Sequence, residues 1–230
     1  MRKFYLFIII TIFVYYVDYK FNFHNFLIIL FYIVLLIFLN YKEQQTWKTH
    51  FGSIKSVTFY TLMYITAFSI FSNLLIFLIF NDLETVIKID KLDLYYILRS
   101  LLIFPFLEEF VFRGSILPKL IKITSKKRAV LFVSIGFTMI HLFSNSSLFL
   151  AMLFSFFISY LYLKTESILL CFMAHILNNF IVLIIFPYLI FNVKIQENKY
   201  YIATTIILCS SLILFNLLKI INYKIIKDVK

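Results

Sequence analysis

Charged side chains are scarce in this sequence, and their scarcity indicates its class. They make up 14% of the 230 residues, whereas hydrophobic residues make up 63%. A soluble domain of this size would have too few polar groups on its surface to stay dispersed. We therefore predict an all-α fold, in which a polytopic bundle of transmembrane helices forms a single integral membrane domain over residues 1–230.

Glycine, proline and cysteine are also rare, with three, three and two residues. A transporter or channel would be expected to contain helices broken by pairs of glycine or proline, and three glycines do not supply them. Cys171 and Cys209 both fall inside apolar runs. This placement predicts packing residues, not a disulfide or a metal site.

Long apolar runs fill most of the chain, and eight of them can be drawn as membrane spans. Some are shorter than the ~20 residues that a transmembrane helix usually needs, so their ends would extend into the flanking residues. The basic N-terminus and the apolar run after it resemble a signal peptide. No small-residue cleavage site precedes Asp18, which predicts a retained first helix. The eight predicted spans are residues 4–17, 26–39, 57–80, 94–117, 129–143, 148–163, 168–191 and 201–221.

The positive charge of the chain is placed to orient it in a membrane. The net charge is +11, but nearly all the lysines lie in short connections between apolar runs, so we predict no nucleic-acid partner. With the N-terminus inside the cell, 15 of the 22 basic residues are cytoplasmic and 5 lie on the opposite side. This bias predicts a multi-pass protein of the cell membrane, with the lipid bilayer around it and both termini in the cytoplasm.

Two glutamates and an arginine lie within the fourth predicted span, where each charge costs at least ~2.5 kcal/mol. Glu109 and Arg113 are four residues apart, so a helix places them on one face in the favourable acid-first order. Glu108 projects about 100° away from Glu109. We therefore expect Arg113 to hold Glu109, while Glu108 remains available as a general base or acid. Pro105, one turn earlier, either frees a backbone carbonyl near these groups or only kinks the helix.

Two of the four histidines lie within predicted spans, each with a partner at helical spacing. His175 and Asn179 share one side of their helix, and Phe137 and His141 share one side of another. Gly136 would allow a neighbouring helix to approach closely. A lone intramembrane histidine is most simply explained by a bond to an adjacent helix, but two histidines and two glutamates together favour a functional site.

Three short motifs carry a resemblance to a known family. The segment E-E-F-V-F-R-G at 108–114 resembles the E-E-x-x-x-R motif of the CPBP family, which contains CAAX proteases and bacteriocin-processing enzymes. The segments at 137–141 and 175–179 are similar to its F-x-x-x-H and H-x-x-x-N motifs, and all three occur in the family's order. The resemblance covers about residues 94–186 and implies a protease core over about residues 94–191.

The resemblance implies an intramembrane endopeptidase that cleaves a peptide or membrane-protein substrate near the cytoplasmic leaflet. Bacteriocin precursors and signalling-peptide precursors are the substrates that fit best, and no feature points to an oligomeric state. The catalytic residue would be Glu108, and His141, His175 and Asn179 would complete the site. The supporting residues are Glu109, Arg113 and Phe137.

Two chemistries fit these residues. Two histidines and a carboxylate are a plausible zinc set. Alternatively, Glu108 deprotonates a water held by His141, while His175 and Asn179 stabilise the oxyanion at the scissile carbonyl. Asn179 is a poor zinc ligand and a good oxyanion donor, so we expect a reaction without metal or other cofactor and keep zinc as the alternative.

Two other functions belong to different classes. A non-proteolytic membrane protein, such as an immunity or scaffold protein that binds a peptide or an enzyme, would need none of the four candidate catalytic residues. A transporter with a buried ion-coupling site would need the broken helices that this sequence lacks. Peptide cleavage distinguishes the first of these from a protease.

Overall fold

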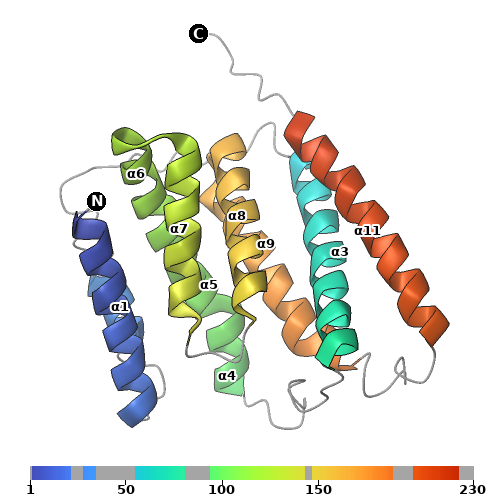
Figure 1. Ribbon diagram of the computed structural model, residues 1–230, viewed down its shortest axis with the longest axis horizontal. Helices are drawn as coiled ribbons and strands as arrows, with labels where there is room; N and C mark the ends of the chain where they lie inside the picture. The colour runs from blue at the N-terminus through green and yellow to red at the C-terminus, as the bar shows by residue number, and fades with distance from the viewer. Residues whose placement is uncertain are drawn as a thin grey trace. The chain divides into compact units, whose positions relative to one another are not determined.

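Every regular element in the described part of the chain is helical, as Figure 1 shows, and this confirms the predicted all-α class. The high hydrophobic content and the rarity of glycine and proline inside the apolar runs are consistent with this result. The computed structural model describes residues 2–21, 28–34, 55–80, 94–142, 147–188 and 199–222.

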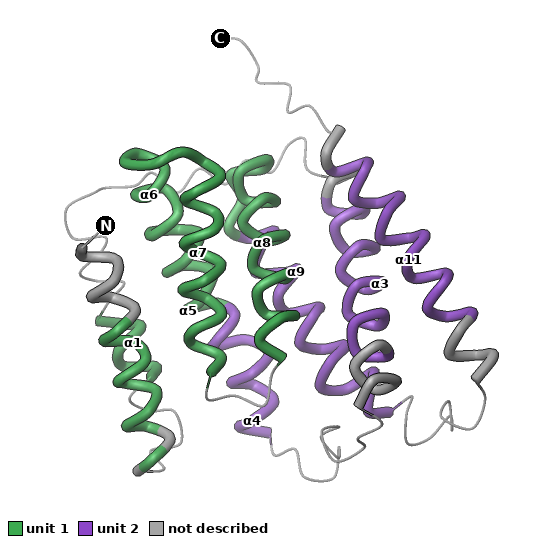
Figure 2. Tube along the Cα trace, viewed as in Figure 1, with its two compact units in different colours: residues 1–49, 106–168 green, residues 50–105, 169–230 purple. Residues whose placement is uncertain are grey.

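The chain divides into two compact units, which Figure 2 colours separately. Unit 1 comprises residues 1–49 and 106–168, and unit 2 comprises residues 50–105 and 169–230. Each unit therefore combines two segments that are separated in the sequence. The prediction of one membrane domain over the whole chain stays a prediction.

Unit 1 is built around two neighbouring helices, α7 (Lys126–Ile140) and α8 (Leu148–Thr165), which lie side by side in Figure 1. Three small residues, spaced four positions apart on α8, are buried. They are Ala151, Ser155 and Ser159. On α7, Gly136 is buried as well. Small side chains let helix backbones approach closely, which fits the approach predicted at Gly136. The other helices of unit 1 are α1 (Arg2–Phe21), residues 28–34, most of α5 (Phe104–Glu109), η3 (Phe110–Ile116) and α6 (Leu117–Ile123).

The turn between α6 and α7 is defined by local capping. Thr124 is extended, and its backbone N–H donates to the carbonyl of Leu120 at 2.8 Å, which closes α6. The Ser125 hydroxyl then accepts from the Arg128 N–H and caps the N-terminus of α7. The helix therefore begins within the basic segment.

Unit 2 is built around α3 (Lys55–Phe80) and α11 (Lys199–Asn222), which pack along each other (Figure 1). The buried residues of α3 include several polar ones, among them Thr61, Ser69 and Ser72. The remaining elements of unit 2 are α4 (Leu94–Leu98), η2 (Arg99–Ile103), α9 (Ile168–Phe180) and η4 (Ile181–Ile185).

The described helices overlap all eight predicted spans; several extend beyond the predicted ends, whereas α7 ends at Ile140, before the predicted residue 143. The span predicted at 94–117 corresponds to a continuous helical run that reaches Ile123, and the one predicted at 4–17 corresponds to α1. Of the span predicted at 26–39, residues 28–34 are helical, and the rest lies outside the described residues.

Two of the described helices are long and apolar enough to cross a membrane, Leu148–Thr165 and Ile168–Tyr188. Shorter apolar helices run over Ile9–Asp18 and Thr204–Ile220. Large apolar side chains are widely exposed, with Phe149 at 68% and Ile207 at 64%. Such a surface is suited to lipid. The number of spans stays a prediction.

Candidate active site

The helical run that carries the two glutamates is not a regular α-helix. Two π-helical segments, η2 and η3, lie on either side of α5. In these segments a backbone N–H bonds to the carbonyl five residues earlier, as from Phe104 to Arg99 and from Leu117 to Phe112. Glu108 and Glu109 therefore occupy the short α-helical stretch between two π segments, a type of distortion that is often found at functional sites. Sequence spacing alone did not predict it.

Arg113 is completely buried, and both of its terminal guanidinium nitrogens donate hydrogen bonds within unit 1. Its Nη1 donates to Glu109 Oε1 at 3.2 Å, and both side chains have 0% exposure. Its Nη2 donates to the backbone oxygen of Ser155 at 3.0 Å and to the Ser155 hydroxyl oxygen at 2.8 Å. The pairing expected from the four-residue spacing is present. Ser155, which the sequence gave no reason to select, provides the second half of the arginine's binding site on α8.

Glu108 is also buried, with 6% exposure, and lies in the same unit. Its immediate neighbour Glu109 takes the guanidinium of Arg113. A buried carboxylate is the kind of group that can exchange a proton during a reaction. Of the two adjacent glutamates, Glu109 forms the ion pair with Arg113 that the spacing predicted, and the role of Glu108 stays a prediction.

The ring of Phe137 contacts both the arginine and the candidate histidine. The Arg113 Cζ lies 4.9 Å from its centroid, a cation–π contact, and the His141 ring centroid lies 4.7 Å away. Phe137 is only 1% exposed, so this contact excludes water from one side of each polar group.

His141 immediately follows the last residue of α7, and this position fixes its ring. The His141 N–H bonds to the Thr138 carbonyl, three residues back, so the Phe137 carbonyl loses its usual helical donor. The His141 Nδ1 lies 2.9 Å from that same Phe137 oxygen. Because a carbonyl only accepts, Nδ1 must carry the hydrogen, and in the neutral ring Nε2 is the basic nitrogen. Nε2 can accept a hydrogen bond from a water or ligate a metal.

In unit 2, His175 and Asn179 lie one turn apart on α9, as predicted. His175 is 3% exposed. The Asn179 Nδ2 donates to the backbone oxygen of Ser100 at 2.9 Å. One of the two side-chain N–H groups of Asn179 is therefore bonded to η2, the helical segment that precedes the glutamates.

Pro105 explains why the Ser100 carbonyl accepts a side chain. If the i→i−5 pattern of η2 continued by one residue beyond Phe104, the N–H of residue 105 would reach Ser100. Proline has no N–H, so the carbonyl has no backbone donor in that register. Of the two alternatives for Pro105, the structure supports the freed carbonyl.

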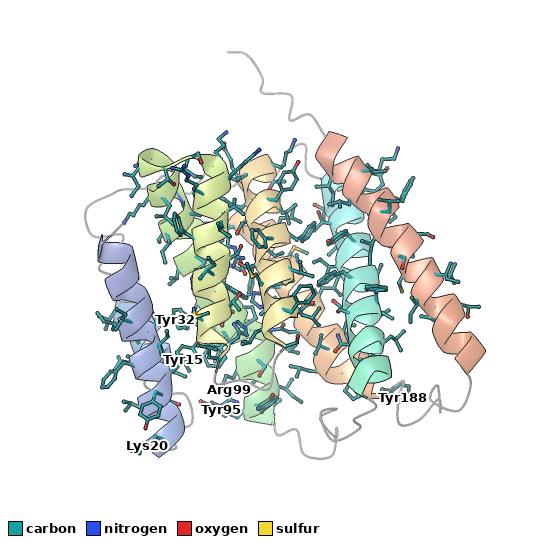
Figure 3. The ribbon with its side chains drawn as sticks, viewed as in Figure 1. Tyr15, Lys20, Tyr32, Tyr95, Arg99 and Tyr188 are labelled. Carbon is teal, nitrogen blue, oxygen red and sulfur yellow. The ribbon has the colours of Figure 1, made fainter. Side chains whose placement is uncertain are left out.

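Two tyrosines outside the motifs form a polar contact in unit 1. The hydroxyl oxygens of Tyr15 on α1 and Tyr32 are 3.2 Å apart, and Figure 3 shows the two side chains together. Tyr32 is fully buried. Tyrosine is so abundant in this sequence that no pattern distinguished these two.

Arg99, the other cation of the fourth predicted span, is accommodated differently. Its Cζ lies 4.9 Å from the ring centroid of Tyr96 and 5.5 Å from that of Tyr95, which is labelled beside it in Figure 3. With the Phe104 ring at 5.9 Å, three aromatic rings lie around a charge that sits in an apolar run.

Within each unit, the described residues contain no group of three histidine, cysteine, aspartate or glutamate side chains able to hold a metal. Cys171 and Cys209 are buried thiols, which agrees with the predicted packing role.

Comparison with known protein families gives a match over the segment that carries the motifs. A family model described as type II CAAX prenyl endopeptidase Rce1-like matches residues 90–181. This range contains all three motifs and confirms the family resemblance. No curated protein and no solved structure matches the chain.

Proposed function

We propose that this chain, which matches the type II CAAX prenyl endopeptidase Rce1-like family over residues 90–181, is an intramembrane endopeptidase that activates water through Glu108. The observation that carries the proposal is the difference between two adjacent buried glutamates. Arg113 holds Glu109 in an ion pair, so Glu108 is the carboxylate suited to proton transfer.

The reaction assigns a separate task to each polar residue. His141, with its hydrogen on Nδ1, accepts a hydrogen bond from the water at Nε2 and orients it. Glu108 takes the proton as the water attacks the scissile carbonyl and later delivers it to the leaving amine. His175 and the second N–H of Asn179 donate to the oxyanion that forms.

The substrate is a membrane-associated peptide or protein that enters the bilayer near the cytoplasmic leaflet. Apolar helices and widely exposed apolar side chains support a multi-pass protein of the cell membrane, and the basic-residue bias supports cytoplasmic termini. We favour precursors of bacteriocins or signalling peptides as the substrates.

Peptidomics tests the proposed activity directly. Membranes that contain the chain should release shorter peptides that are absent when Glu108→Ala replaces it, because that variant lacks the base. Arg128→Ala, an exposed change in the same unit, should release the same peptides as the unchanged chain. Identical peptides from all three samples would instead favour the non-proteolytic immunity or scaffold protein.

A prenylated C-a-a-X peptide and unprenylated apolar peptides, added separately to the purified chain, distinguish the substrate classes.

A chelation experiment tests the metal-free chemistry. In a zinc version, His141, His175 and Glu108 would hold the ion, which would acidify the water. Without metal, the purified chain should keep its activity under strong chelation and contain no stoichiometric zinc. Asn179→Ala should lose about 10²–10³-fold in kcat with little change in KM, the usual effect of removing one oxyanion donor. The metal-free mechanism would be contradicted if the purified chain contained one zinc per chain and His141→Ala lost it. Activity would then also fall when zinc is removed and recover when zinc is added.

A further inference from the structure

A chain of hydrogen bonds in unit 2 ends on the candidate oxyanion residue. The Ser69 hydroxyl on α3 donates to Asn178 Oδ1 at 2.7 Å. Asn178 Nδ2 donates to Asn179 Oδ1 at 3.2 Å, and Asn179 Nδ2 donates to the Ser100 backbone oxygen at 2.9 Å. Three helical elements that are distant in sequence, α3, α9 and η2, are connected by these bonds. Ser69 lies outside the segment that matches the family.

The direction of every bond in this chain follows from its last acceptor. The Ser100 carbonyl can only accept, so the nitrogen of the Asn179 amide must face it. The Asn179 oxygen then faces Asn178, which must present its own nitrogen. The Asn178 oxygen therefore faces Ser69, whose hydroxyl can donate a hydrogen bond to it. Reversing either amide would bring two acceptors or two donors together.

Both ends of the chain are held by backbone features. At one end, Pro105 leaves the Ser100 carbonyl without a donor in the π-helical register, so that carbonyl is available to Asn179. At the other end, Ser69 is completely buried, and its own carbonyl accepts from Asn73 Nδ2 at 2.7 Å. The orientation of the Asn179 amide plane is therefore set by a network and not by one contact.

We infer that Ser69 and Asn178 are positioning residues that fix the Asn179 amide, so that its second N–H has one direction. This inference rests on the proposed function, in which that N–H donates to the scissile carbonyl oxygen as it becomes negative. Without the Ser69 donor, the Asn178 amide can rotate, and Asn179 loses the bond that selects its orientation. An oxyanion donor that samples two orientations stabilises the transition state less, while substrate binding is unchanged.

Kinetics of Ser69 variants test the positioning role. Ser69→Ala should lower kcat by about 3–10-fold, the size expected for the loss of one neutral hydrogen bond, with KM unchanged. Asn178→Asp keeps the shape but has no donor for Asn179, so it should lower kcat further. Thr66→Ala, whose lost hydroxyl bonds only to the Leu62 carbonyl of the same helix, is the matched control and should keep kcat.

Two more measurements separate positioning from a merely structural role. Adding Ser69→Ala to Asn179→Ala should lower kcat no further, because nothing remains to be positioned. The side-chain amide NMR signals of Asn178 and Asn179 should shift in Ser69→Ala and stay in place in Thr66→Ala. Additive kcat losses, or shifted signals with unchanged kcat, would overturn the positioning role. Unshifted amide signals would contradict the hydrogen-bond chain itself. If the unchanged chain cleaves no peptide, the proposed function fails, and with it the role that positioning would serve.

Discussion

Glu108→Gln should lower cleavage by about 10²–10⁴-fold without reducing the amount of folded protein. The amide has nearly the shape of the carboxyl group and fits the same buried position, but it cannot take a proton from water. Activity of the purified variant and its thermal unfolding in detergent, measured on one preparation, check both halves of this expectation.

Glu109→Gln is the matched control, because it makes the same chemical change one residue away. It removes the charge that balances Arg113 inside unit 1, so it should lower the unfolding temperature more than Glu108→Gln does. If Glu109→Gln folded normally and lost cleavage while Glu108→Gln kept it, the roles that we assign to the two glutamates would be exchanged.

The second large effect is expected from Arg113→Ala, which should cost about 3–5 kcal/mol of stability. The change leaves Glu109 buried and charged without its partner and removes the donor to the Ser155 carbonyl and hydroxyl. The yield of folded protein and the unfolding transition measure this loss. Arg128→Ala removes an exposed arginine in the same unit and should have an effect close to zero.

Two further variants identify the cause of that loss. Arg113→Lys keeps the charge but cannot reach both Glu109 and Ser155 with a planar fork, so its stability should be intermediate. Replacing Glu109 and Arg113 together by leucine should recover part of the stability, because no buried charge is left unpaired. If Arg113→Ala were fully stable yet inactive, the arginine would have a role in the reaction and not in stabilising the fold.

The spacing of residues in the sequence predicts most of the site contacts that lie within one helix. The pairing of Glu109 with Arg113 was predictable because four residues on a helix bring two side chains to one face whatever surrounds them. The spacing of His175 and Asn179, and of Phe137 and His141, is local in the same sense. That His141 would bond to the Phe137 carbonyl was not predictable, because it depends on α7 ending at Ile140.

The composition determined that the protein is helical, because apolar runs with few glycines, prolines and charges have little other structure available to them. The motifs and their order determined the family resemblance. Only the tertiary structure decided that Ser155 receives Arg113, that Tyr15 meets Tyr32, and that the Ser100 carbonyl receives Asn179. These partners are 17 to 79 residues apart, and one of them is a backbone carbonyl, which every residue carries and no sequence pattern marks. Such contacts follow from helix packing and from the register of a π-helical turn, and neither is set by local spacing.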